Sequence, residues 1–398
     1  LQYAKRLSPT TIFMVVGWTI ILLIGQRVGL GDYLSHNIGS SVNFHVRRAL
    51  KGDVPIHQRL KILAVDDPTV ALRGESRLSP SALVQLLRAL DRKKPAKIII
   101  DSMFGQRQDV SQDERTFVAA IQGLGTPIVA SAMISPQDFP TRSEVRENKF
   151  TTAWSALGTL PANIKRIDKG KIYGPEGAFL GAFSRIGHLQ DLVQNYVAPA
   201  IVVNRLIPIP YIGLYAADDL RIDKGQLLVN GVSVSMDERG LVPVDHLSGA
   251  SLSTAIMSLE PFYREAEDAL DSIMPDDVVI IFTQYATGIT QFVNSPFGLV
   301  PAPWLLAANA NSVLRGAWLR SAGHERLWLL VLTFAGIAFG LSVPLSRFFT
   351  ALSVVFGGLM AVFVGLFAVA GVEVPWALPM LGFLGAVNLG YSEQRHCL

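Results

Sequence analysis

Long apolar blocks lie at both ends of the chain, and a stretch of shorter apolar runs lies between them. The first block covers residues 11–30 and follows Lys5 and Arg6. Three further blocks, with very short connections between them, lie at residues 327–345, 348–371 and 374–391. A helix needs about 20 apolar residues to cross a bilayer, and each block is about that long. We therefore predict four transmembrane helices.

Two alternatives to these spans follow from the same pattern. The first block would be a cleaved signal peptide if a small-residue cleavage site followed it. Gln26 and Arg27 stand there instead, which favours a retained anchor. The last three blocks would form a buried soluble bundle if they had polar faces, but their polar residues are few.

Charged residues beside the blocks predict their orientation. Lys5 and Arg6 place the N-terminus in the cytoplasm by the positive-inside rule, and four spans return the C-terminus to that side. Arg315, Arg320 and Arg326 would then lie outside, against the rule, which has least force beside a large translocated domain. The predicted organisation is a cytoplasmic tail at 1–10, a span at 11–30, an extracytoplasmic domain at 31–326, spans at 327–345, 348–371 and 374–391, and a cytoplasmic tail at 392–398.

Between the apolar blocks, two short β-branched runs each end in acidic residues. Residues 61–65 run into Asp66 and Asp67, and residues 97–100 run into Asp101. Such runs are typical of buried parallel strands whose polar ends emerge at the edge of a sheet. We therefore expect both acidic ends at one edge.

Helical patterns alternate with these strands. Ser79, a candidate N-cap followed by Pro80, begins a stretch with leucines at helical spacing. The capping box at 111–114 predicts a second helix. Strands are predicted at 127–130 and 276–282. Strand, helix and strand in this order imply parallel pairing with right-handed crossovers, and hence an α/β domain with a mainly parallel, doubly wound sheet.

Two smaller features complete the predicted fold. Residues 226–234 predict an added β-hairpin region, because Asn230 and Gly231 suit the two positive φ angles of a type I′ turn. A helix between the first span and the domain is marked by Val42, Phe44, Val46 and Leu50, with Arg47, Arg48 and Lys51 expected on a solvated face. The predicted fold class is thus an α/β extracytoplasmic domain with this hairpin region, plus four transmembrane α-helices.

Composition agrees with a membrane protein. Hydrophobic residues make up 50% of the chain and charged residues only 17%. Mean hydropathy is +0.35, which is high for a soluble protein. The net charge of +3 is too small to indicate a nucleic-acid partner. Cys397 is the one cysteine, so no disulfide can form within the chain.

Six segments, taken in order, carry a resemblance to a known family. They are VDDPTV at 65–70, LSPSALVQLLRALDRKKPAKIIIDSMF at 78–104, DERTFVAAI at 113–121, GQLLVNGVSVSMDERGLVPVDHLSG at 225–249, DDVVIIF at 276–282 and NANSVLRGAWL at 309–319. With one span before the domain and three after it, this order resembles the CHASE2 sensor-domain family. GESRLSP at 74–80 and LVPAPWLL at 299–306 depart from the family pattern, so a ligand bound at those positions would differ or be absent.

The resemblance implies a function. CHASE2 domains occur in bacterial receptors, commonly ahead of class III adenylate cyclases, histidine kinases or serine/threonine kinases. We expect a multi-pass protein of the bacterial inner membrane, with a periplasmic sensor domain, both termini in the cytoplasm and an effector in the same or another chain. The expected partners are the bilayer, a second copy or a membrane or periplasmic protein, and the effector; we expect no nucleic acid and no cofactor. The alternative is a membrane-anchored scaffold subunit.

Candidate ligand-binding residues follow from the strand ends. In open α/β sheets, ligands bind beyond the carboxyl ends of the strands. The residues placed there are Asp66, Asp67, Asp101, Ser131 and Thr283. Their carboxylates could hold a cation or a basic ligand, or transfer protons. Alternatively, they cap helices and bind loop amides. His188 is a further candidate ligand residue, or else a buried structural histidine.

No catalytic constellation accompanies these candidates. The sequence holds no phosphate-binding G-x-x-x-x-G-K-[ST] loop, no G-x-S-x-G elbow and no kinase signature set. An enzyme acting in the periplasm through Asp66 and Asp101 is the least favoured alternative. Catalysis is expected instead from a downstream domain of the cyclase or kinase type, as the resemblance implies.

Overall fold

The computed structural model describes residues 8–75, 78–103, 112–135, 164–175, 181–189, 191–193, 196–203, 208–223, 226–237, 239–266, 268–284 and 292–396. The chain forms two compact units. Residues 53–319 form an α/β unit, and the residues on either side of it together form a helical unit.

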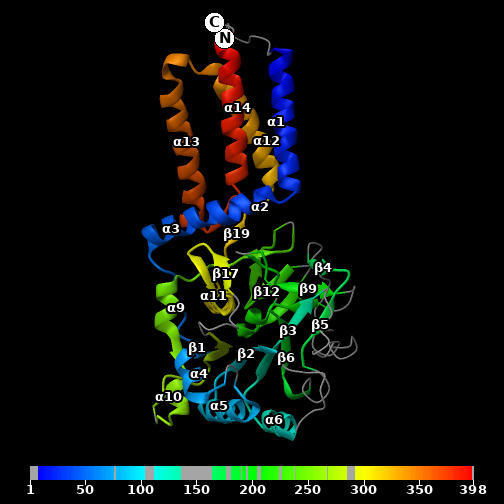
Figure 1. Ribbon diagram of the computed structural model, residues 1–398, viewed down its shortest axis with the longest axis vertical. Coiled ribbons are helices and arrows are strands. Elements are labelled where there is room, and N and C mark those ends of the chain that lie inside the picture. The colour runs from blue at the N-terminus through cyan, green and yellow to red at the C-terminus, as the bar shows by residue number, and fades with distance from the viewer. Residues whose placement is uncertain are drawn as a thin grey trace. The chain divides into compact units, whose positions relative to one another are not determined.

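A mostly parallel sheet is the centre of the α/β unit (Figure 1). Its strands lie in the order β15-β1-β16-β2-β3-β5, and β6 also pairs with β3. In the described part of this sheet, every pair of strands is parallel except β3 with β5. The strands are β15 (Ile256–Ser258), β1 (Leu60–Val65), β16 (Val278–Thr283), β2 (Lys97–Met103), β3 (Ile128–Ser135), β5 (Lys171–Tyr173) and β6 (Arg185–His188). The predicted mainly parallel α/β sheet is confirmed, with the late strand β16 inserted between β1 and β2.

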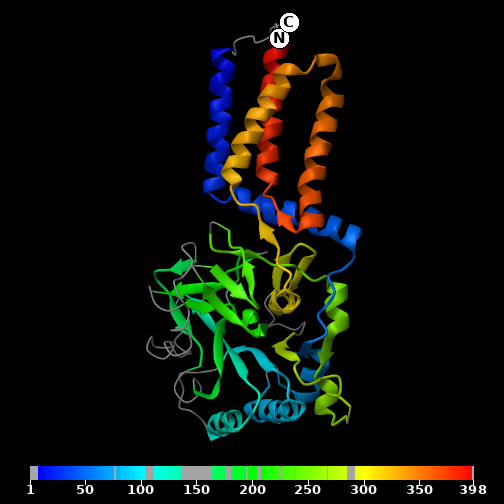
Figure 2. The same cartoon turned by 180° about the vertical axis from the view of Figure 1, so that it is seen from behind.

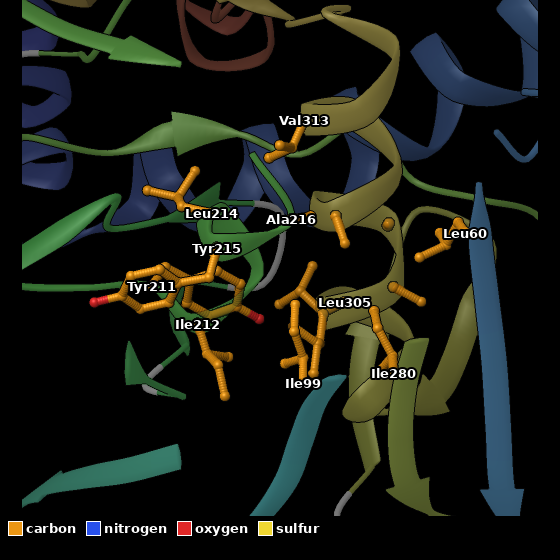
Figure 3. Packing of buried hydrophobic residues seen from close by; sticks show 14 of the residues in the cluster. Leu60, Ile99, Tyr211, Ile212, Leu214, Tyr215, Ala216, Ile280, Leu305 and Val313 are labelled. Carbon is orange, nitrogen blue, oxygen red and sulfur yellow. The ribbon is translucent and has the colours of Figure 1, made fainter. Parts of the chain in front are cut away.

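Alternate residues of each strand point to opposite faces of the sheet. On β1, Ile62 and Ala64 join the core formed with α11 (Pro303–Arg315) and the 3₁₀ helix η3 (Ile212–Ala216). Figure 3 shows residues of this core, with side chains of the sheet facing those of α11 and η3. The intervening residues of β1 belong to the core under α5 (Pro80–Lys93) and α6 (Gln112–Gln122). Because both faces are covered, the middle residues of the central strands are apolar.

The helix starts follow the local sequence. Ser79 is the N-cap residue of α5 and Pro80 its first residue, as predicted. The Ser79 backbone N–H donates to Glu75 Oε2 over 3.0 Å. This bond satisfies one of the N–H groups that a helix start leaves without a partner in the helix. The helix ends at Lys94, which has a left-handed φ of 55°. In the predicted capping box, Ser111 lies outside the described residues, while α6 begins at Gln112.

Smaller sheets surround this core. The predicted hairpin is present as β12 (Gln226–Val229) and β13 (Val232–Val234), and φ is 50° at Asn230 and 77° at Gly231. β11 (Leu220–Asp223) pairs with β12. The remaining elements of this unit are α4 (Asp67–Arg73), β4 (Lys165–Ile167), β7 (Asp191–Val193), β8 (Tyr196–Val197), β9 (Ala200–Val203), β10 (Pro208–Pro210), β14 (Val242–Pro243), α9 (Gly249–Ala255), α10 (Glu260–Tyr263), β17 (Phe292–Ser295) and β18 (Gly298–Pro301).

The helical unit holds four long helices side by side (Figures 1 and 2). They are α1 (Pro9–Arg27), α12 (Glu325–Ser342), α13 (Phe348–Gly365) and α14 (Ala377–His396). Shorter pieces complete the unit: α2 (Leu30–Leu34), η1 (Ser35–Gly39), α3 (Ser40–Lys51), β19 (Arg320–Ser321), η4 (Leu345–Arg347), η5 (Leu366–Ala370) and β20 (Val372–Glu373).

Three helical segments in the described part are long and apolar enough to cross a membrane: Pro9–Arg27, Glu325–Ser342 and Leu345–Ala370. They correspond to three of the four predicted spans. The fourth, α14, is not among them, because Glu393, Gln394 and Arg395 make its last turns polar. Its crossing of the bilayer therefore stays a prediction.

Glycines let α14 pack closely against two other helices. A Cβ at Gly336 or Gly340 of α12 would lie 2.5 Å from a backbone carbonyl oxygen of α14. Gly385 of α14 makes room for the indole of Trp18 on α1. In contrast, a Cβ at Gly357 or Gly358 of α13 would meet nothing within 4 Å. Close helix packing therefore explains the glycines of α12 and α14 but not those of α13.

Polar contacts tie α1 to its neighbours at both of its ends. Near the N-terminus, the Ser8 backbone N–H donates to Glu393 Oε1 over 2.9 Å. The Thr11 hydroxyl donates to the other oxygen of the same carboxylate over 2.5 Å. At the far end of α1, Gln26 Nε2 donates to Glu325 Oε2 of α12 over 3.2 Å. We call the contact of Ser8 and Thr11 with Glu393 the terminal clamp.

Candidate ligand-binding edge of the sheet

The carboxyl ends of the parallel strands bring most of the predicted site residues to one edge. Val65, which precedes Asp66, pairs with Thr283 of β16. On the other side of β16, Ile281 pairs with Ile100, which precedes Asp101. Ser131 of β3 pairs with Met103, after a register shift between Ile100 and Met103 in β2. We call this region the carboxyl edge.

Asp66 is held by three hydrogen bonds at this edge. Its Oδ1 accepts from the Thr69 backbone N–H over 3.2 Å and from the Thr69 hydroxyl over 2.6 Å, which makes Asp66 the N-cap of α4. The Ser258 hydroxyl donates to the same oxygen over 2.9 Å. The helix-capping role considered for Asp66 is therefore present, and its role in ligand binding stays a prediction.

Asp101 has a different environment. Burial raises the pKa of its carboxyl group to about 6, because the charged form loses water contacts. A carboxyl with this pKa exchanges its proton close to neutral pH and can donate or accept a hydrogen bond. Beside it, the Ser131 hydroxyl donates to the Ser102 carbonyl over 2.7 Å, and Ser131 is fully buried. The Ser131 hydroxyl thus binds the backbone of β2 within its register shift.

The sequence did not reveal two further polar residues of the edge. Ser258 ends β15, a strand of three residues that is too short to give a periodic signal. Gln284 follows Thr283, and its backbone N–H donates to the Val65 carbonyl over 2.9 Å. Its side-chain oxygen accepts from Trp304 Nε1 over 2.7 Å, so a residue at the start of α11 orients it. The one sequence signal for Gln284 at the carboxyl edge is its position just after the predicted strand at 276–282.

The other two candidates differ from these in exposure. Asp67 lies in the first turn of α4 and is exposed. His188 ends β6, is fully buried, and packs edge-to-face on Tyr211 with 5.5 Å between ring centroids. Burial lowers the pKa of His188 to about 3, so its ring is neutral at physiological pH. This packing favours the structural role considered for His188.

Charges at the opposite, amino ends of the strands bind one another. Asp218 lies 3.3 Å from Arg59 and 3.7 Å from Lys97 between charged atoms. Lys97 Nζ also donates to the Ala217 carbonyl over 2.5 Å. Burial lowers the pKa of Lys97, and the nearby Asp218 opposes that shift. Because these groups are mutually paired, this end is less suited to a charged ligand than the carboxyl edge.

The carboxyl edge offers hydrogen-bonding groups and one carboxyl that is readily protonated, which suits a polar ligand. Within the part of the chain that the structure describes, no group of three or more His, Cys, Asp or Glu residues is placed to hold a metal ion. The segments 104–111 and 285–291, which follow β2 and β16, lie outside the described residues.

Comparison with models of protein families gives a match over most of the chain. Residues 19–338 match the family model described as CHASE2 domain. The matched range includes the whole α/β unit, part of α1 and most of α12. No curated protein and no solved structure matches the chain.

Proposed function

The chain belongs to the CHASE2 domain family, and from this premise we propose that it is a membrane receptor whose α/β unit senses a signal and whose helices relay it to a cytoplasmic effector. One observation carries the proposal. The α/β unit is a single insertion, residues 53–319, between α1 and α12 of one packed helical unit. A change inside the α/β unit therefore reaches the helical unit through both chain connections.

We propose the following topology. The α/β unit lies in the periplasm, the helical unit crosses the bacterial inner membrane four times with α14 as the last span, and both termini are cytoplasmic. The three apolar helical segments and the extracytoplasmic nature of CHASE2 domains support this arrangement. Single cysteines in a Cys397→Ser background test it in intact cells. A membrane-impermeant maleimide should label Val232→Cys and not Thr10→Cys.

The packing of the helical unit suggests how a signal could travel. α14 touches both α12 and α1, through glycines in each contact, and the terminal clamp joins Glu393 to the start of α1. A ligand shifts such a bundle only if it binds one of two packings more tightly than the other. We propose that the signal alters how α1 packs on α14, and that the C-terminal end of α14 carries the change to the effector.

We place the ligand at the carboxyl edge. Asp101 has a pKa raised to about 6, and a cationic or hydrogen-bond-donating ligand would stabilise its charged form. Asp66 and Ser258 join the ends of two neighbouring strands to α4, so a ligand that engages Asp66 would compete with the cap. This competition would give the α/β unit two states.

The proposed partners are a second copy of the chain or another membrane or periplasmic protein, and a cytoplasmic effector of the adenylate cyclase or kinase type. The alternative function is a scaffold, in which the α/β unit binds a protein partner and the helices only anchor it. The two functions differ in one consequence: only a sensor changes its cytoplasmic output when its α/β unit changes.

A reporter fusion distinguishes them. A class III cyclase domain is joined after residue 398, and cyclic AMP is measured in cells that lack their own cyclase. The variant Asp66→Asn/Asp101→Asn alters the carboxyl edge, and Asp268→Asn, an exposed acid on the same unit, is the matched control. The sensor function predicts at least a twofold change of output for the edge variant alone. Equal output from all three proteins at equal expression would support the scaffold.

A further inference from the structure

The segment Leu30–Lys51, made of α2, η1 and α3, has an inner face that binds the rest of the helical unit. On this inner face, the Ser40 hydroxyl donates to Glu373 Oε1 over 3.1 Å. Trp376 Nε1 donates to Asn43 Oδ1 over 3.2 Å. Phe44 packs edge-to-face on Phe367, with 4.9 Å between ring centroids. The segment is therefore fixed to η5 and to the residues between η5 and α14.

The outer face carries a ridge of aliphatic side chains. Ile38, Val42, Val46 and Leu50 recur every fourth residue and so form one row along the helix. Ile38 is 50% exposed, Val42 is 37% exposed and Leu50 is 68% exposed, and Val46 is half-buried. A row of four branched aliphatic residues, three of them exposed, is unusual for a helix surrounded by water.

Basic side chains lie on the same segment as the ridge. The Arg47 guanidinium lies 5.7 Å from the ring centroid of Phe367, and Lys51 Nζ donates to the Val369 carbonyl over 2.9 Å. Arg48 and Arg27 are exposed. From residue 27 to residue 53 the sequence holds four Arg or Lys and two Asp or Glu residues. The segment therefore joins an apolar ridge to a net positive charge.

The position of the segment within the helical unit indicates what covers the ridge. Both views show α2 and α3 running across the ends of the long helices α1, α12, α13 and α14 (Figures 1 and 2). The segment follows α1 after two residues, and α1 exposes Ile20, Ile21 and Ile24 near that end. Val28 and Tyr33 continue this exposed apolar surface into the segment, at 78% and 64% exposure.

We propose that Leu30–Lys51 is an interfacial helix that lies in the headgroup layer of the membrane and binds anionic phospholipids. An amphipathic helix with basic residues and exposed aliphatic residues buries its apolar side at the boundary of headgroups and acyl chains, and anionic lipids strengthen its binding. The ridge continues the lipid-facing surface of α1, and Arg27, Arg48 and Lys51 supply the charge. The inference requires only that the apolar helices cross a bilayer, and it is independent of any signal relay.

The immersion of the ridge is tested with nitroxide labels on the intact chain in lipid nanodiscs. Single cysteines replace Val42, Ile21 and Val232 in a Cys397→Ser background. Ile21 on α1 represents a lipid-facing position, and Val232 in the hairpin represents an exposed position of the α/β unit. We expect the label at 42 to collide with oxygen more than with a water-soluble nickel chelate, as at 21 but at shallower depth. Chelate access equal to that at 232 would overturn the proposal, as would low access to both reagents, which would indicate that protein covers the ridge.

The lipid preference is tested separately with charge variants. The melting temperature is measured in nanodiscs of phosphatidylcholine with and without phosphatidylglycerol. We expect phosphatidylglycerol to raise the wild-type melting temperature, and Arg27→Gln/Arg48→Gln to lose at least half of that rise. Arg88→Gln, an exposed arginine on α5, should keep all of it. The preference for anionic lipid is refuted if phosphatidylglycerol does not raise the melting temperature of the wild type. It is also refuted if the double variant melts as the wild type does in phosphatidylcholine and still shows the full rise with phosphatidylglycerol.

Discussion

At the carboxyl edge, the proton on Asp101 links the stability of the α/β unit to pH. The folded pKa of about 6 lies above the unfolded value of 3.8. The folded state therefore binds more protons between these two values, and this contribution to stability is complete below pH 4 and is lost as pH rises through 6. Asp101→Asn should raise the free energy of unfolding by about 1–3 kcal/mol at pH 7.5 and by less than about 1 kcal/mol at pH 4.

Unfolding of the nanodisc-embedded chain, followed at several pH values, checks this dependence. Asp268→Asn is the control, because Asp268 is exposed and should change the free energy of unfolding by less than about 0.5 kcal/mol at every pH. If Asp101→Asn stabilised the protein equally at pH 4 and pH 7.5, burial would not be raising the pKa of Asp101.

Asp66 is held in place by hydrogen bonds. Asp66→Ala should lower the free energy of unfolding by about 1–2 kcal/mol, since it removes the N-cap of α4 and the bond from Ser258. Ser258→Ala should have a smaller effect, about 0.5–1.5 kcal/mol, because the cap remains. Chemical denaturation at constant pH measures both variants. If Asp66→Ala were neutral, the capping role of Asp66 would be wrong.

Among the elements, the contact of α12 with α14 depends on glycine. Gly336→Leu should lower the free energy of unfolding by about 2 kcal/mol or more, because the side chain would displace the α14 backbone. Gly357→Leu on α13 places the same side chain where a Cβ meets nothing within 4 Å. Melting of both variants in nanodiscs compares them. Equal destabilisation would indicate that α13 has a partner outside this chain.

The existence of most elements could be predicted from local pattern, but the strand order could not. The start of α5 follows from Ser79 and Pro80, which favour a helix N-terminus. The hairpin turn follows from Asn230 and Gly231, which tolerate positive φ angles. The insertion of β16 between β1 and β2 depends on contacts between distant segments, on which hydrophobic periodicity gives no information. β15 was missed because a strand of three residues shows no period.

The candidate site was predictable to the same extent. Asp66, Thr283 and Asp101 share an edge because parallel strands end on the same side of a sheet. The bonds that hold Asp66 and Gln284 come from Ser258 and Trp304, which no local pattern connects to them. The sequence left open whether His188 binds a ligand or is buried, and its burial depends on the pairing of β6 with β3 across a long separation in sequence.

In the whole molecule, the α/β unit is tethered to the helical unit at both of its ends, before Asp53 and after Leu319. In the proposed relay, this two-ended tether converts a small change in the sheet into a shift of α1 relative to α12 and α14. The terminal clamp is the point where such a shift would appear, because Glu393 bonds there to Ser8 and Thr11. If the helices served only as an anchor, a change in the α/β unit would not be expected to alter the terminal clamp.

The most direct test of the relay is to lock the terminal clamp and measure the output of the cyclase fusion. Thr11→Cys and Glu393→Cys, in a Cys397→Ser background, are joined by a short bifunctional methanethiosulfonate that reductant removes. Cyclic AMP synthesis is compared in membranes with the wild-type carboxyl edge and with Asp66→Asn/Asp101→Asn. Relay through α1 and α14 predicts that the difference in output between these edges disappears in the locked state and returns after reduction. A difference of the same size in the locked and reduced states would contradict it.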